Sequence, residues 1–486
     1  MCKIETLKLP EGYEVYEKSI DTFEGKVFAL VKDERTREKY LYIEGEGHPG
    51  FIDGEKIKGG LLFPKNVENA YKLSEIFPYL KARPLGIGEP SFGFGDRLGI
   101  ATAGHVRALG NRKVRPIFAQ QSIREMERTK RGPKEVMADA IWGVFQEGYR
   151  DGFGSDADHL KTEEHVKNLA DAGFTMFTCD PSDHVNNNVG RMDNTQIKEA
   201  FSKLEGGDAL LAKYEGKKVK IASKEIVFDY EPLIKAIVKY KKAIDHTERM
   251  YNFAKSYVKG TFDFELSIDE TDEPTSPLEH LFIASELKER GIKITGLAPR
   301  FVGDFQKAID YIGDLSRFEE EFRLHIEIAK MYGPYKISVH SGSDKFSIYP
   351  IVGKYGEGLF HVKTAGTSYL EALRVIAVHD PKLFAEIYTF SLDRFEEDRA
   401  TYHLTTDLSR VPDINILSED EYIRLLDEND PRQVLHVTYG SVLTVKSDDG
   451  KYLFRDRFFD TLKIFEDEYI KVLVKHFEKH LNPLEG

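Results

Sequence analysis

Polar and apolar residues alternate in the segment from Phe262 to Asp269, which reads FDFELSID. Successive strand residues point to opposite faces, so Glu265 and Asp269 share a face with Asp263 and Ser267. Enclosing carboxylates costs on the order of several kcal/mol for each uncompensated charge. The segment therefore predicts either an acidic strand face serving a metal ion or proton transfer, or an edge strand whose acidic face is solvated.

Histidines follow two other predicted strands. His340 ends the alternating run KISVH, and His159 follows Asp158 in GSDADHLKT. Neutral imidazole is a common ligand of zinc, nickel, manganese and iron. In the alternative interpretation His340 is an ordinary buried polar residue, and Asp156 or Asp158 caps a helix that begins near Thr162.

A glycine-rich segment, GFGDRLGIATAGH, places Arg97 just before a predicted helix. Glycines allow close approach of a ligand, and a helix N-terminus favours anions. Arg97 is therefore either a partner for a substrate carboxylate or half of a structural pair with Asp96. Both interpretations fit the sequence equally well.

Eight short apolar segments follow residue 84, and each is followed by helical or inserted sequence. This order predicts an α/β fold, a TIM-like (β/α)8 barrel, with active-site residues at the carboxyl ends of its strands. A doubly wound sheet is the second choice, because it would gather its polar residues at one switch point. The predicted parts are a β-rich cap over residues 1–83, the barrel over 84–383 with a helical insertion at about 195–259, and a helical extension over 384–486.

Composition excludes several classes of protein. Lys and Arg number 69 against 82 Asp and Glu, a net charge of -13, which opposes binding to nucleic acid. We expect no signal peptide and no membrane segment, because no apolar run approaches the ~20 residues that span a bilayer. Two cysteines are too few for a disulfide framework, so we expect a cytoplasmic protein. The sequence does not indicate an oligomeric state.

Six strings in this order resemble the tagaturonate epimerase family: SFGFGDRLG, SDADHLKT, FELSIDETDEPTSP, LAPRFVGDF, ISVHSGSDKFSIYP and KTAGTSYLEALR. The resemblance covers about residues 84–380 and extends less distinctively over the flanks. It implies an isomerase that interconverts D-tagaturonate and D-fructuronate in hexuronate catabolism with a divalent metal (Zn, Ni, Mn, Fe or Co).

The resemblance also implies roles for particular residues. His159 and His340 are expected metal ligands, with a third among Asp269, Glu270 and Asp304, of which we take Asp269. Asp158 and Glu265 are the expected catalytic proton-transfer groups.

The resemblance implies that the substrate is a small ketouronate, whose carboxylate needs a cation. Arg97, Arg300 and Lys345 are the expected substrate-binding residues, because each lies in a loop after a predicted strand. Epimerisation at C4 can proceed by retro-aldol cleavage of the C3–C4 bond or by proton removal and return at C4. Alternatives are a metal-dependent sugar isomerase or aldolase and, with less support, a sugar-acid sensor.

Overall fold

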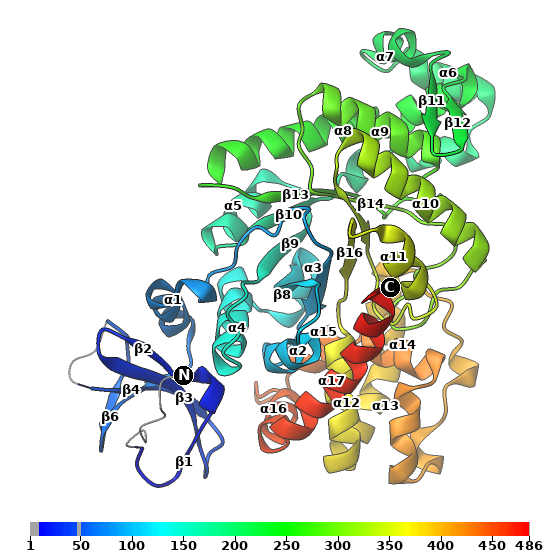
Figure 1. The fold of residues 1–486 in the computed structure, drawn as a ribbon. Helices are drawn as coiled ribbons and strands as arrows, with labels where there is room; N and C mark the ends of the chain where they lie inside the picture. Colours follow the sequence, from blue (N-terminus) through cyan, green and yellow to red (C-terminus); the bar gives the residue numbers. More distant parts are fainter. Residues whose placement is uncertain (1–8, 46–49, 486) are drawn as a thin grey trace.

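The chain forms a closed barrel of eight parallel strands, as predicted (Figure 1). The computed structural model describes residues 9–45 and 50–485, so Cys2 lies outside the described residues. The strands follow one another around the barrel in chain order, and the last, β16, pairs with the first, β7. They are β7 (Ser91–Gly95), β8 (Arg115–Ser122), β9 (Gly154–Leu160), β10 (Met176–Cys179), β13 (Asp263–Ile268), β14 (Gly296–Pro299), β15 (Lys336–Val339) and β16 (Phe360–Lys363).

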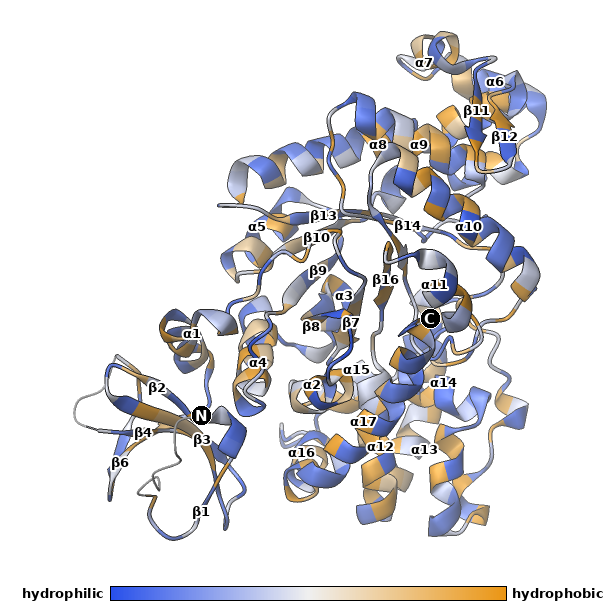
Figure 2. Cartoon of the chain, in the orientation of Figure 1, coloured by the Kyte–Doolittle hydropathy of each residue, from blue (hydrophilic) through white to orange (hydrophobic). Residues whose placement is uncertain are grey.

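Helices surround the barrel and bury apolar side chains against the strands. Figure 2 shows hydrophobic and hydrophilic residues alternating along them, as expected for helices with one buried face. They are α2 (Thr102–Leu109), α3 (Ile123–Thr129), α4 (Pro133–Gln146), α5 (Glu163–Asp171), α8 (Tyr230–Tyr257), α9 (Pro277–Glu289), α10 (Leu315–Tyr332), α11 (Tyr349–Gly356) and α12 (Thr367–His379). The prediction of strand–helix alternation is therefore confirmed.

A small antiparallel sheet forms the N-terminal cap, beside the barrel. Its elements are β1 (Tyr13–Val15), β2 (Asp21–Phe23), β3 (Lys26–Asp33), β4 (Lys39–Glu44), β5 (Glu55–Ile57) and β6 (Gly60–Pro64), followed by helix α1 (Val67–Ile76). Helix α1 packs on α4 of the barrel. Glu466 of the C-terminal helix α17 (Glu466–Leu481) accepts hydrogen bonds from Lys39 and from Tyr16 in the cap. The N-terminal cap and helix α17 thus hold each other beside the barrel.

The insertion between β10 and β13 is more varied than a purely helical segment. It contains α6 (Asn194–Ser202), α7 (Gly207–Tyr214) and an antiparallel hairpin of β11 (Lys218–Ile221) and β12 (Lys224–Val227). The long helix α8 closes this segment and is itself the barrel helix that packs on α5 and α9. The predicted insertion therefore includes part of the barrel wall.

Helices also form the C-terminal extension: α13 (Pro381–Asp398), α14 (Asn429–Val437), α15 (Tyr439–Thr444), α16 (Arg455–Ile464) and α17. The predicted boundary at 383/384 falls inside α13. Helix α17 packs on α2 and α12, the first and last helices of the barrel. Among the described residues, no helix has the length and apolar character needed to span a bilayer.

Candidate active site

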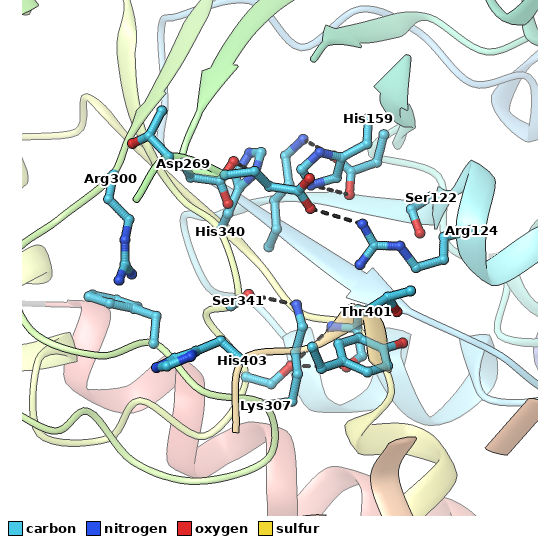
Figure 3. Close-up of a pocket in the computed structure, with 18 of the residues that line it drawn as sticks. Ser122, Arg124, His159, Asp269, Arg300, Lys307, His340, Ser341, Thr401 and His403 are labelled. Carbon is cyan, nitrogen blue, oxygen red and sulfur yellow. Dashed lines mark hydrogen bonds and ion pairs between the residues drawn. The ribbon is translucent and has the colours of Figure 1, made fainter. Parts of the chain in front are cut away.

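A cavity of about 650 Å³ opens at the carboxyl ends of the barrel strands. Barrel loops line most of it, and the segment Thr401–His403 of the C-terminal extension lines the rest. Figure 3 shows His159 and His340 on one side and Lys307, Thr401 and His403 on the other. The charged residues that line the cavity are Arg97, Arg124, Glu125, Asp158, His159, Arg191, Asp269, Glu270, Asp272, Arg300, Asp304, Lys307, His340, Lys363 and His403.

His159 is held in an uncommon backbone conformation at the end of β9. Its φ of 56° lies in the left-handed region, where non-glycine residues are uncommon and cluster at functional sites. This turn breaks the strand alternation, so both Asp158 and His159 line the cavity. Thr162, not Asp158, caps the following helix α5. The capping alternative for Asp158 is therefore wrong.

Carboxylates hold the imidazole of His159. Nδ1 lies 3.3 Å from Asp180 Oδ2, and Nε2 lies 3.9 Å from Asp158 Oδ2. Burial opposes a charge on His159, but Asp158 and the hydrogen bond with Asp180 outweigh it and raise its pKa to about 10. A carboxylate on one ring nitrogen, with the other nitrogen directed elsewhere, is the usual setting of a metal-binding histidine.

His340 lies between two carboxylates of β13 and its loop. Nε2 is 2.7 Å from Glu265 Oε1, and Nδ1 is 3.3 Å from Asp269 Oδ1. Burial opposes its charge, but Asp269 and the hydrogen bond with Glu265 raise its pKa to about 9. A Cβ at Gly296 would lie 2.5 Å from Glu265 Oε2, so the missing side chain at 296 makes room for this glutamate. The predicted inward acidic face of β13 is therefore present.

Lys363, at the end of β16, joins three buried carboxylates. Its Nζ lies 2.6 Å from Asp156, 2.9 Å from Asp158 and 2.8 Å from Glu265. Burial by itself would raise the pKa of Asp158 and Glu265, but the ammonium holds both well below their usual range. Sequence reasoning missed Lys363, although FHVK alternates like the acidic strand and indicates that His361 and Lys363 share a face.

Asp156 and Glu265 are enclosed in the barrel, whereas Asp158 reaches the cavity. Glu265 is fully buried and absent from the cavity lining. Its Oε1 also accepts from Thr178, while Oε2 has no hydrogen-bond partner in the part of the chain that the structure describes. Burial raises the pKa of Asp156 to about 6, against the attraction of Lys363. The structure thus brings both predicted proton-transfer residues together, but it exposes only Asp158 to a ligand in the cavity.

Donor atoms suited to a divalent cation converge beside the cavity. One atom each from Asp158, His159 and His340 lies within 4.8 Å of the other two, and His159, Asp180 and Glu270 form an overlapping group. Nitrogen and carboxylate donors of this kind suit a divalent transition metal. The described residues therefore fit the predicted cofactor class.

The three residues considered for the third ligand position occupy different places. Asp269 is in contact with His340, and Glu270 is in the group around His159. Asp304 instead lies 3.8 Å from Arg300 and 4.0 Å from His403, outside both groups.

Comparison with known proteins gives a consistent family assignment. The family model described as tagaturonate epimerase matches residues 16–484. The chain belongs to the tagaturonate epimerase family. A tagaturonate/fructuronate epimerase of Thermotoga maritima is 46% identical over 480 residues, 98% of each chain. The family is one of epimerases, so the chain is an isomerase.

Solved structures of this family share the whole fold. The native fructuronate-tagaturonate epimerase from Cohnella laeviribosi has a TM-score of 0.94 and 41% identity, and the match covers 98% of this chain and 97% of that one. A glycerol complex of that enzyme also has a TM-score of 0.94, over 97% and 96% of the two chains. The prediction of family and fold from the sequence is therefore confirmed.

In this member of the tagaturonate epimerase family, the three predicted substrate-binding cations differ in position. Arg97 lines the cavity, but its Nε pairs with Glu125 at 2.8 Å and its guanidinium lies 3.6 Å from the ring centre of Tyr439. Arg300 lines the cavity beside Asp304.

Lys345 is fully buried and absent from the cavity lining. Its Nζ donates to the carbonyls of Gln306, Ile309 and Ser343. Ser341 and Asp344 both have positive φ, and the loop turns Lys345 into the protein. The structure therefore does not place Lys345 where it could touch a ligand.

Proposed function

We propose that this enzyme interconverts D-tagaturonate and D-fructuronate by inverting C4, with a divalent metal held by His159, His340 and Asp269. Family membership over residues 16–484 supports the reaction. The convergence of imidazole and carboxylate donors at the barrel mouth supports the metal. Glu265 on Nε2 of His340 and Asp180 on Nδ1 of His159 would fix the two rings.

When bound, a divalent cation would act as a Lewis acid on the C2 carbonyl and the C3 oxygen of the ketouronate. Asp158 is the proton-transfer group in this proposal. It reaches the cavity, and Lys363 keeps it ionised. A carboxylate in that state can accept the proton of the C4 hydroxyl.

Of the two predicted proton-transfer residues, only Asp158 lines the cavity, and this favours the retro-aldol route over direct removal of the C4 hydrogen. Direct inversion needs two bases on opposite faces of C4, and Glu265 is enclosed with Oε1 held by His340, Lys363 and Thr178. In the retro-aldol route, Asp158 takes the hydroxyl proton and the C3–C4 electron pair moves towards C2, which leaves an aldehyde at C4. The aldehyde turns, the C3–C4 bond forms again on its other face, and Asp158 returns the proton. In this proposal Glu265 is a positioning residue for His340.

NMR of the metal-loaded protein with D-fructuronate in deuterated water tests the proposal. We expect signals of D-tagaturonate with no deuterium at C4, because the C4–H bond stays intact. Deuterium at C4 would contradict the retro-aldol route, whereas a three-carbon product or an aldose would identify an aldolase or an isomerase instead. Chelation should abolish turnover and release a metal detectable by elemental analysis, and a divalent transition metal should restore it.

A further inference from the structure

Lys307 differs from the other lysines and arginines that line the cavity. Its Nζ donates to the neutral Ser341 Oγ at 2.6 Å (Figure 3). Within residues 9–45 and 50–485, no carboxylate lies within ion-pair distance of this nitrogen. The other such cations each have an acidic partner: Arg97 with Glu125, Arg124 with Glu270, Arg191 with Asp272, Arg300 with Asp304, and Lys363 with Asp156, Asp158 and Glu265. An ammonium facing a cavity without an acidic partner is suited to a negatively charged ligand.

The position of Lys307 suits the far end of the substrate. Its hydrogen-bond partner Ser341 directly follows His340, so the ammonium is held by the residue next to the proposed metal ligand. In a ketouronate, four bonds separate the C2 carbonyl carbon from the C6 carboxylate carbon. With C2 beside His340, the carboxylate can extend along the β15 loop towards Lys307.

The loop that carries Lys307 is held by buried side chains at four consecutive carbonyls. Lys345 donates to Gln306 and Ile309, Gln433 Nε2 donates to Lys307 at 3.1 Å, and Arg432 Nε donates to Ala308 at 2.9 Å. Ala308 has a φ of 62°, an uncommon conformation for a non-glycine residue that such fixed carbonyls can maintain. The backbone of Lys307 is therefore fixed before any ligand binds, which reduces the entropy lost on binding.

We infer that Lys307 is the cation that binds the substrate carboxylate and so selects ketouronates over neutral ketoses. The inference rests on the proposed function, whose substrate selectivity it explains. Gln433 and Arg432 are positioning residues, supplied by α14 of the C-terminal extension. Lys345, which the sequence suggested as a carboxylate partner, contributes by holding the loop from behind.

The test compares D-fructuronate with D-fructose, which lacks the carboxylate. Lys307→Met should lower kcat/KM for fructuronate roughly ten- to hundred-fold, the loss expected for one charge-assisted contact. Most of this loss should come from a higher KM. The kcat/KM for fructose should change less than about threefold. Lys307→Arg should retain part of the selectivity for fructuronate. Equal losses on both sugars, or no loss on either, would overturn the inference.

Three further variants make the test specific. Lys293→Met is the matched control, because Lys293 is exposed before β14, at the opposite end of the barrel. Gln433→Met should raise KM for fructuronate while leaving kcat and the fructose values in place, a pattern that a general loss of stability would not give. If Arg300→Met lowers the preference for fructuronate and Lys307→Met does not, the carboxylate binds at Arg300 and our assignment is wrong.

Failure of the proposed function has a different signature. If wild-type protein interconverts neither sugar, calorimetric binding of D-fructuronate replaces kinetics. If Lys307→Met then binds D-fructuronate more weakly than wild type, the assignment of the carboxylate site stands even though the proposed epimerase reaction fails. Equal binding by the two proteins would overturn the carboxylate site as well.

Discussion

Replacing Lys363 with methionine leaves Asp156, Asp158 and Glu265 facing one another without the ammonium that lies 2.6 to 2.9 Å from them. Removing one member of a buried ion pair costs ~3–5 kcal/mol. Unfolding entropy of about 2.1 cal mol⁻¹ K⁻¹ per residue amounts to about 1 kcal mol⁻¹ K⁻¹ for 486 residues. The expected fall in Tm is therefore about 3–5 °C, measured by scanning calorimetry.

The same change should alter the pH dependence of catalysis. Lys363 lowers the pKa of Asp158, so its removal raises that pKa. Because Asp158 acts as a base in our proposal, the acidic limb of the kcat/KM profile should move to higher pH. A loss of about 3 kcal/mol at the site corresponds to a roughly hundred-fold lower kcat/KM at neutral pH.

A second substitution separates charge from packing. Asp156→Asn, combined with Lys363→Met, removes one of the three negative charges and should recover part of the lost Tm. Asp156 is the suitable choice because its pKa is already raised, to about 6. The reasoning is refuted if Lys363→Met keeps kcat/KM within about threefold of wild type with an unchanged acidic limb.

The remaining predictions concern the metal and stability. His159→Ala and His340→Ala should each weaken metal retention by ~10–100-fold, and normal metal content by elemental analysis in both would show that these are not the ligands. Lys345→Met should lower Tm, because three carbonyls lose their donor at ~1–3 kcal/mol each, and an unchanged Tm contradicts this role. Burial opposes the charge of Glu466, but Lys39 lowers its pKa from 4.5 to about 2, which corresponds to about 3 kcal/mol. This contribution to the free energy of unfolding is present above pH 4.5 and is lost as the pH falls towards 2. Glu466→Gln should therefore lower Tm at neutral pH. Between pH 4.5 and 2, chemical denaturation should show a smaller loss of unfolding free energy in this variant than in wild type.

Local patterns were enough to predict the barrel and much of its mouth. Alternation from Phe262 to Asp269 showed which side chains face inwards, because the period of a strand is fixed by its backbone. Asp158, His159 and His340 follow predicted strands, and they were expected at one face of the barrel because the carboxyl ends of parallel strands all lie on the same side. The six sequence motifs between about residues 84 and 380 also led to the correct family.

Contacts between distant segments could not be predicted in this way. Lys363 and Asp158 are 205 residues apart, and no local pattern shows that they meet. Lys345 follows His340 by five residues, and only the folded loop, with its left-handed Ser341 and Asp344, shows that its ammonium turns inwards.

Lys307 illustrates the same division between sequence and tertiary structure. The sequence shows a charged residue in a loop after a strand, which describes many surface lysines. Among the described residues Lys307 has no acidic partner, and three side chains fix its loop; both features depend on α14 and the β15 loop packing beside it. Charge pairing and burial are properties of the assembled fold, so the tertiary structure alone decided which cation is available to a ligand.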